Sequence, residues 1–186
     1  MSNSPAASPG PRLRIAISGK SGCGNSTVSR LVAAKLGLRM VNYTFKDLAR
    51  DKGMSFEEIC VKAEEDPQYD LTIDRMQVQL AQHGGCVLGS RLAIWLLRDT
   101  AFTVYLNASI QVRAARIARR EGKDIAVALR ETVERDNRDH DRYARLYGYD
   151  VNRYDFAVLV VDAESLGQEA VAQEIVDHAA GMNAPR

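Results

Sequence analysis

The chain has 186 residues, of which 46% are hydrophobic and 26% charged, a composition typical of one folded domain with a full core. The formal net charge of +1 provides no overall field that would favour nucleic acid or an anionic membrane. The three cysteines are odd in number and widely spaced, without a C-x-x-C pair or a Cys/His ligand spacing, which indicates free thiols in a reducing compartment.

Residues 1–11 are rich in Ser, Pro and Ala and contain no apolar segment, which is typical of a flexible tail and not of a signal peptide. No run reaches the roughly 18 apolar residues of a membrane span. We therefore expect a cytoplasmic protein with one domain over 12–180 and a short second tail at 181–186.

The first apolar segment, 13–18, predicts a strand that leads into a turn with glycines at 19, 22 and 24 and then into a helix that ends at Leu36. Strand, glycine turn and helix N-terminus in this order form a phosphate cradle, because backbone N–H groups converge on an anion that the helix dipole also favours. The spacing fits G-x-x-x-x-G-K-[ST] except that Asn25 replaces the lysine, and a lysine stands earlier, at Lys20. The loop residues expected to hold nucleotide phosphates are Gly19, Ser21, Gly22, Cys23, Gly24, Asn25, Ser26 and Thr27.

Three of these loop positions carry further expectations. Ser26 stands where a hydroxyl would bind Mg²⁺. Asn25 brings no charge to the phosphates, so we hypothesise that Lys20 supplies it, from the same chain or across a dimer; the alternative is a solvated lysine and weak binding. The helix N-terminus would stabilise a Cys23 thiolate, although a small side chain filling a variable loop position is the simpler interpretation.

Strand and helix patterns then alternate along the chain, which predicts a parallel sheet covered on both faces. Ser55 and Glu58 form a capping box at the start of one helix. Helices are expected at 45–52, from 55, at 71–82, from 109 to a break at 121–123, from 124 to 147 and at 168–179, and strands at 38–43, 86–90, 101–106 and 155–161. A ligand of such a sheet lies beyond the carboxyl ends of the strands, where Ser18/Gly19, Asn42/Tyr43, Ser90/Arg91 and Asn107 would stand.

An arginine-rich helix end precedes the break at 121–123. Arg113, Arg116 and Arg120 are spaced i, i+3 and i+7 on one face, with Arg119 beside them. A basic helix end before a hinge suits a lid over about 113–124 that closes on phosphates and excludes water. The alternatives are a solvated amphipathic face and an RNA-binding patch, which the lack of interleaved aromatic residues disfavours.

A second charged face lies in the next helix. Arg135, Asp139 and Arg142 are spaced i, i+4 and i+7, and alternating signs of this kind usually form surface ion pairs. The three histidines of the chain are expected at the surface, and beyond a nucleotide-borne Mg²⁺ no metal-ligand cluster is expected.

Longer stretches resemble the short cytidylate kinases known from archaea and related bacterial sequences. Gly-Met-Ser-Phe-Glu-Glu-Ile (53–59) and Ala-Glu-Glu-Asp-Pro (63–67) are similar to the nucleoside-monophosphate-binding region of that family. Ser-Arg-Leu-Ala-Ile-Trp (90–95), the segment 112–123 and the segment 142–150 are similar to its Gly-Arg-Leu-Ala-Gly-Trp, its lid and its segment before the last strand.

This resemblance implies an α/β P-loop kinase with a five-stranded parallel sheet flanked by helices, with monophosphate-binding and lid segments. The implied reaction converts ATP and CMP or dCMP to ADP and the diphosphate, with Mg²⁺. Small-molecule nucleotides are the implied partners; a membrane or a nucleic acid is not, and the chain would act as a monomer or a homodimer.

The resemblance also implies roles for single residues. Arg116, Arg119 and Arg120 would clamp the transferring phosphoryl group, with Lys20 as the added catalytic cation. The acceptor site would comprise Lys46, Asp74, Arg75, Arg91, Arg135, Asp139 and Arg142.

Three departures from the family pattern qualify the activity. Asn25 replaces the loop lysine, Gly89 replaces an acidic residue, and Lys46 replaces an arginine and loses its bidentate fork. The first two substitutions remove a cation and an anion from one site. They either compensate for each other or indicate that catalysis has been lost while binding is retained. Two functions follow: an active kinase, or a catalytically weak nucleotide sensor of the same fold that signals to a partner.

Overall fold

The structure, a computed structural model, describes residues 13–182, and a five-stranded sheet lies at its centre in the order β2-β3-β1-β4-β5. Every neighbouring pair of strands is parallel. The strands are β1 (Arg14–Gly19), β2 (Arg39–Val41), β3 (Cys86–Gly89), β4 (Phe102–Asn107) and β5 (Leu159–Asp162). The helices are α1 (Asn25–Leu36), α2 (Phe45–Lys52), α3 (Phe56–Glu65), α4 (Gln68–Ala81), α5 (Ala93–Leu96), α6 (Ile110–Glu121), α7 (Ile125–Tyr147) and α8 (Gln168–Met182).

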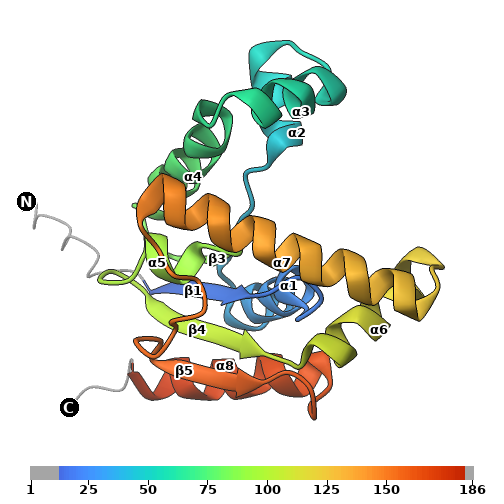
Figure 1. Cartoon of the computed structure of the whole chain (residues 1–186). Helices are drawn as coiled ribbons and strands as arrows, with labels where there is room; N and C mark the ends of the chain where they lie inside the picture. Colours follow the sequence, from blue (N-terminus) through green and yellow to red (C-terminus); the bar gives the residue numbers. More distant parts are fainter. Residues whose placement is uncertain (1–12, 183–186) are drawn as a thin grey trace, which may run out of the picture.

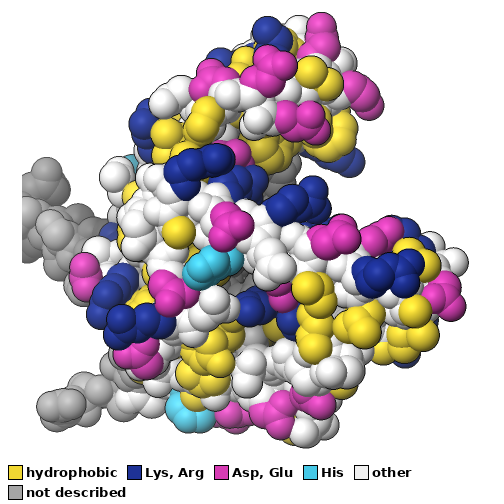
Figure 2. All heavy atoms as spheres, viewed as in Figure 1, with side chains coloured by type: hydrophobic (Ala, Val, Ile, Leu, Met, Phe, Trp, Pro, Cys, Tyr) yellow, Lys and Arg dark blue, Asp and Glu magenta, His cyan; other side chains and the backbone are white. Residues whose placement is uncertain are grey.

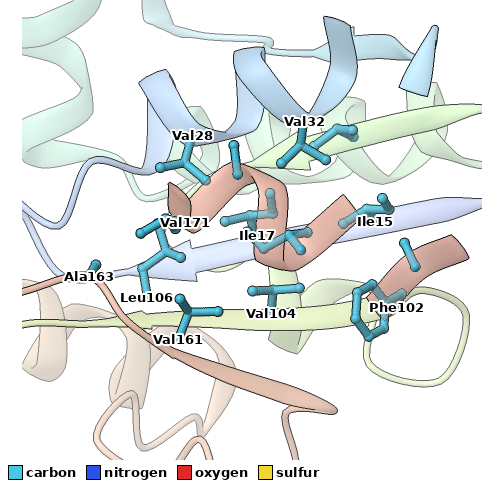
Figure 3. Close-up of a cluster of buried hydrophobic side chains, with 14 of the residues drawn as sticks. Ile15, Ile17, Val28, Val32, Phe102, Val104, Leu106, Val161, Ala163 and Val171 are labelled. Atoms are coloured by element: carbon cyan, nitrogen blue, oxygen red, sulfur yellow. The ribbon is translucent and has the colours of Figure 1, made fainter. Parts of the chain in front are cut away.

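One face of the sheet is covered by α1 and α8. Because alternate residues of a strand point to opposite faces, Ile15 and Ile17 pack on this side, where both are fully buried. Figure 3 shows Val28 and Val32 of α1 directed toward these strand residues. Burial of each such side chain stabilises the fold by about 1.5–3 kcal/mol, so this apolar layer fixes the position of the loop that joins β1 to α1.

The opposite face is covered by α4, α5 and α7, and Figure 1 shows α7 running across the sheet. Its core contains Ala16 of β1 and several aromatic side chains. Tyr105 stacks on Tyr154 with ring centroids 3.7 Å apart, and Trp95 meets Tyr105 edge-on at 6.3 Å. Tyr143 of α7 belongs to the same cluster, so this packing holds α7 against β1 and β4.

A small lobe of α2 and α3 stands away from the sheet at the top of Figure 1, with α4 leading back to the body. A separate apolar cluster that includes Leu48 and Ile59 holds the lobe together. The capping box of Ser55 and Glu58 is present, as predicted, and Thr44 with Asp47 forms a second one. The lobe therefore has its own core and is joined to the sheet by β2 and α4.

The predicted sequence of strands and helices is confirmed, and the differences have local causes. The helix predicted from 71 begins at Gln68, directly after Pro67, because proline is well suited to the first turn of a helix. The last strand begins at Leu159 and not at 155, since Tyr154 and Phe156 pack into the aromatic core instead. The short helix α5 was not predicted.

The two chain ends differ in how far the structure describes them. The predicted tail at 1–11 lies outside the described residues, whereas α8 continues to Met182 and includes the start of the second predicted tail. Within residues 13–182, no helix combines the length and the apolar character that crossing a bilayer requires.

Candidate nucleotide-binding site

The loop between β1 and α1 has the backbone of a phosphate cradle. Gly22 and Gly24 have φ values of 88° and 101°, a left-handed conformation that side chains other than glycine rarely adopt. A Cβ at Gly22 would also lie 2.8 Å from the carbonyl oxygen of Arg113. The loop therefore needs glycine both for its turn and for its close contact with α6.

Asn25, at the position of the missing lysine, is bound to the loop itself. Its Nδ2 donates a hydrogen bond of 2.6 Å to the carbonyl oxygen of Gly19. Its Oδ1 is buried and has no hydrogen-bond partner among the described residues. The amide thus stabilises the start of the loop and brings no charge to it.

The loop opens onto a cleft of about 920 Å³, which we call the loop cleft. It is lined by Lys20, Ser21, Gly22, Gly24, Asn25, Ser26, Thr27, Gly89, Ser90, Arg91, Arg116, Ile117, Arg119, Arg120, Arg135, Leu166, Gly167 and Gln168. Five arginines and one lysine belong to this lining, and no Asp or Glu does among the described residues. The cleft is therefore strongly positive and suited to an anion with several charges. Cys23 does not line it.

The arginines of α6 divide into two groups. Arg116, Arg119 and Arg120 line the loop cleft, and Arg116 Nη2 donates a hydrogen bond of 2.6 Å to the carbonyl oxygen of Ala163. Arg113 is only 3% exposed and does not share their environment, contrary to the predicted common face.

Arg113 instead has a structural role beneath the loop. Its Nη2 lies 2.7 Å from Asp136 Oδ2, and its Nη1 donates a hydrogen bond of 3.0 Å to the carbonyl oxygen of Ser21. Sequence spacing missed this role because the partner carboxylate comes from the next helix, α7. The buried pair therefore connects α6, α7 and the loop.

Arg91 follows β3 and joins the loop to α7. It forms an ion pair with Asp139, and its Nη2 donates a hydrogen bond of 3.1 Å to Ser21 Oγ. Arg135 Nη1 donates to the same hydroxyl at 3.5 Å. Arg142 continues the chain of contacts, with Nη2 3.6 Å from Asp139 Oδ1. The predicted face of Arg135, Asp139 and Arg142 is thus turned toward the site and not toward open solvent.

A second cleft, of about 660 Å³, separates the lobe from α7, and we call it the lobe cleft. Figure 2 shows this hollow beneath the upper lobe, with Lys and Arg side chains at its border. Phe45, Cys60 and Glu64 line its lobe side, and Arg138 and Arg145 are among the α7 residues that line the other side. None of these five is among the individually predicted site residues, although Glu64 lies in the segment 63–67 that resembles the monophosphate-binding region of the family.

A smaller cavity of about 230 Å³, the inner cavity, lies between α4, α7 and the end of β3. Asp70, Asp74 and Gln77 of α4 line it together with Tyr43 and Arg142. Gln77 Nε2 donates a hydrogen bond of 2.9 Å to the carbonyl oxygen of Tyr43, and its Oε1 is buried without a partner in the described part of the chain. A signal for this cavity exists in the sequence, since the three α4 residues are spaced i, i+4 and i+7.

Burial changes the acidity of the groups in these cavities. Burial raises the pKa of Asp139, and the guanidinium groups of Arg91 and Arg142 oppose this upward shift. Burial also raises the pKa of Asp70 and of Asp74, and Tyr147, which donates a hydrogen bond to Asp74, opposes the latter shift. Keeping these buried carboxylates ionised costs free energy, and a ligand that donates hydrogen bonds to them would lower that cost.

Cys23 does not become a thiolate, because burial raises its pKa to about 11 despite the nearby Arg113. The simpler interpretation of this residue, a small side chain that fills the loop, therefore fits the structure. All three cysteines are free.

Two residues implied by the family resemblance lie away from these cavities. Lys46 is exposed on α2, with Nζ 5.7 Å from the ring centroid of Phe56. Arg75 is exposed on α4, and neither residue lines the loop cleft, the lobe cleft or the inner cavity. The structure brings Arg91, Arg135 and Arg142 together, and leaves Lys46 and Arg75 outside.

Gly89 lies against α1, where an acidic residue would not fit. A Cβ there would lie 2.2 Å from Ser29 Oγ and 2.6 Å from Ser29 Cβ. Ser29 is buried, and its hydroxyl has no partner among the described residues. The small residue on β3 and the serine on α1 therefore fit one another.

A protein-held magnesium ion does not fit the residues present. Ser26 lines the loop cleft and is exposed there, so it offers one neutral hydroxyl oxygen. Magnesium sites normally include one or two carboxylates, and residues 13–182 contain no cluster of three or more His, Cys, Asp or Glu able to hold a metal. Magnesium ligation by Ser26 stays a prediction.

The sheet order, the glycine loop and the arginine-lined cleft define a P-loop kinase, and solved structures share this fold. Shikimate kinase from Acinetobacter baumannii has a TM-score of 0.62 and 16% identity, over 94% of this chain and 96% of its own. Deoxyadenosine kinase from M. mycoides has a TM-score of 0.52 and 17% identity, over 92% of this chain and 100% of its own.

Sequence comparison defines the family within this class. The family described as "Cytidylate kinase-like family" matches residues 14–165. "Cytidylate kinase 2" of Borrelia garinii is 38% identical over 89% of this chain and 95% of its own length. "Cytidylate kinase" of Aeropyrum pernix is 42% identical over 88% of this chain and 96% of its own length. The chain belongs to the cytidylate kinase-like family.

Proposed function

We propose that the protein transfers the γ-phosphoryl group of ATP to CMP or dCMP and releases ADP and the pyrimidine diphosphate. The names of its relatives support this acceptor. The observation that carries the proposal is Arg91, which lines the loop cleft, the lobe cleft and the inner cavity at once. A phosphate held by this guanidinium would face donor and acceptor together.

The loop cleft receives the donor in this mechanism. Backbone N–H groups of the loop hold the donor phosphates, and Arg116, Arg119 and Arg120 bind the oxygens of the transferring group. A phosphate oxygen of the acceptor forms a bond to the γ-phosphorus while the bond to the β–γ bridging oxygen breaks. Catalysis then consists of positioning and charge stabilisation, without a covalent protein intermediate.

Lys20 supplies the cation that Asn25 lacks. It lines the loop cleft of its own chain, which favours a role within one subunit over a role across a dimer. We expect Lys20→Ala to lower kcat about a hundredfold, since charge stabilisation of the transferring group is lost. The exposed Lys62 of α3 provides a control, and full activity of Lys20→Ala would end this assignment.

The inner cavity receives the base. Gln77 Oε1 and the Asp74 carboxylate are acceptors that suit the exocyclic amino group of cytosine, and the buried Arg142 Nε is a donor that suits its ring nitrogen or carbonyl oxygen. Uracil presents a carbonyl oxygen where cytosine presents the amino group, so it would leave Gln77 Oε1 unpaired, at a cost of about 1–3 kcal/mol.

A coupled assay with ATP, Mg²⁺ and a panel of monophosphates tests the proposal. We expect turnover on CMP and dCMP to exceed that on UMP, AMP and GMP by at least about tenfold. Gln77→Ala should raise the KM for CMP about tenfold, while Gln79→Ala, an exposed position of the same helix, should leave it unchanged. Nucleotide binding without turnover on any monophosphate would contradict the kinase and support the sensor, which the neutral Asn25 favours.

A further inference from the structure

The charges of the loop cleft are all of one sign. Of its six cationic side chains, Arg91 and Arg120 are paired with carboxylates, at Asp139 and Glu121. The other four form no ion pair within residues 13–182; they are Lys20, Arg116, Arg119 and Arg135. The cleft thus holds four cations that form no ion pair in the described part of the chain and are available to a ligand.

Carboxylates near the cleft do not enter it. Glu164 is close enough to Arg116 for the two charges to interact, but its carboxylate accepts a hydrogen bond of 2.7 Å from the Ser109 backbone and does not line the cleft. Asp136 is bound to Arg113 beneath the loop. The carboxylates of Glu164 and Asp136 are therefore already bound to other groups of the protein.

The end of β3 is closed to a carboxylate by Ser29, since any Cβ at Gly89 would meet its hydroxyl at 2.2 Å. This packing explains why position 89 of the lining does not hold an acid. A carboxylate could enter here only if the side chain on α1 were removed as well.

We infer that the loop cleft binds the metal-free polyphosphate of a nucleotide at least as tightly as it binds the magnesium complex. The inference rests on the proposed function, because it deepens the role of the donor site. A divalent ion reduces the negative charge of the triphosphate by about two and adds positive charge among six cations. With no carboxylate to offset that charge, the fully ionised nucleotide gains more from the positive potential of the cleft.

Calorimetric titration of the full chain with ADP and with a non-hydrolysable ATP analogue tests this inference. Each nucleotide is titrated in EDTA and in excess Mg²⁺, at equal ionic strength and without a monophosphate. We expect the Kd in EDTA to equal or fall below the Kd in Mg²⁺. Tighter binding of the magnesium complex overturns the inference alone, whereas absence of binding in both conditions contradicts the proposed function itself.

Two sets of variants connect the result to the cleft. Arg119→Ala should raise the Kd of the metal-free nucleotide about tenfold and that of the magnesium complex about threefold, because the more highly charged ligand loses more. Arg130→Ala removes the same charge from an exposed position of α7 outside the cleft and should change neither value. Equal effects of Arg119→Ala on the two forms would count against the inference.

A carboxylate introduced at position 89 should make the cleft prefer the magnesium complex over the metal-free nucleotide. Gly89→Asp combined with Ser29→Gly places an acid at the strand end and removes the clash, and we expect the magnesium complex then to bind about tenfold tighter than the metal-free nucleotide. Ser29→Gly alone is the control and should keep the wild-type preference. Thermal melts establish that both variants fold, and an unchanged preference in the folded double variant contradicts the inference.

Discussion

The loop cleft and the inner cavity differ in how their charged side chains are paired. The loop cleft is lined by six cations and, among the described residues, by no carboxylate. The inner cavity mixes signs: Asp70 lies 3.0 Å from Arg142, and Tyr147 donates a hydrogen bond to Asp74. One side is open and positive, and the other is a network whose members are mostly paired with each other.

This difference separates affinity from selectivity. A positive cleft attracts any polyphosphate, because Coulomb attraction has little directional preference. A paired polar network rejects ligands that cannot replace its hydrogen bonds, since buried polar groups left unpaired are costly. We therefore expect nucleotide affinity to depend on the loop side and base choice on the α4 side, with Arg91 lining both.

The largest expected effect on activity follows from removing the Arg91 side chain, which lies between the two sides. Arg91→Ala should lower kcat/KM for the monophosphate about a thousandfold, because this guanidinium lines both sides and, in the proposed mechanism, orients the acceptor phosphate toward the donor. Steady-state kinetics measure it, and Arg91→Lys should recover only part of the loss, since an ammonium group lacks the bidentate fork. Activity of Arg91→Ala within tenfold of wild type would show that the two sides are not connected through this residue.

A second comparison uses two arginines of the same helix. Arg113→Ala should lower the free energy of unfolding by about 3 kcal/mol, because it leaves the Asp136 carboxylate buried without its partner. Arg119→Ala, at the cleft, should leave stability nearly unchanged and affect nucleotide binding instead. Chemical denaturation gives both values. Replacement of the pair by Arg113→Met with Asp136→Leu should restore much of the loss; a stable Arg113→Ala single variant would contradict the structural role.

A smaller effect is expected at Ser21, whose hydroxyl accepts hydrogen bonds from Arg91 and Arg135. Ser21→Ala should raise the KM for the monophosphate about three- to tenfold with little change in kcat, as expected for one neutral–charged contact. Ser165→Ala, at an exposed position outside the three cavities, serves as the control. An unchanged KM would mean that the guanidinium groups keep their positions without the hydroxyl.

The smallest effect concerns pH. Burial raises the pKa of Asp74, so the folded state binds this proton more readily than the unfolded state. The contribution of Asp74 to stability is therefore fully present below its unfolded pKa and is lost as pH rises through its folded pKa. Asp74→Asn should be slightly more stable than wild type at pH 7, and this difference should vanish at low pH. A gain that is independent of pH would contradict the assignment, and exposed Asp141→Asn is the control.

Prediction of local structure from the sequence succeeded where a residue's neighbours are close in the chain. The loop from Gly19 to Thr27, the capping box at Ser55 and the helix break at Gly122 depend on backbone conformation and local hydrogen bonds, and each was identified correctly. The roles given to Lys46 and Arg75 stay predictions, and both side chains lie outside the cavities described above.

The sequence by itself identified the family, through the resemblance of several long stretches in the same order. It also determined the alternation of strands and helices and the glycine loop, because periodicity and spacing along the chain carry that information. Only the tertiary structure decided that Arg113 is buried against Asp136, that Ser29 fills the space beside Gly89 and that Gln77 donates a hydrogen bond to the Tyr43 backbone. These contacts depend on which elements meet in the fold, and the groups that meet are 23, 60 and 34 residues apart. The spacing of residues within a single helix or strand does not specify contacts of this kind.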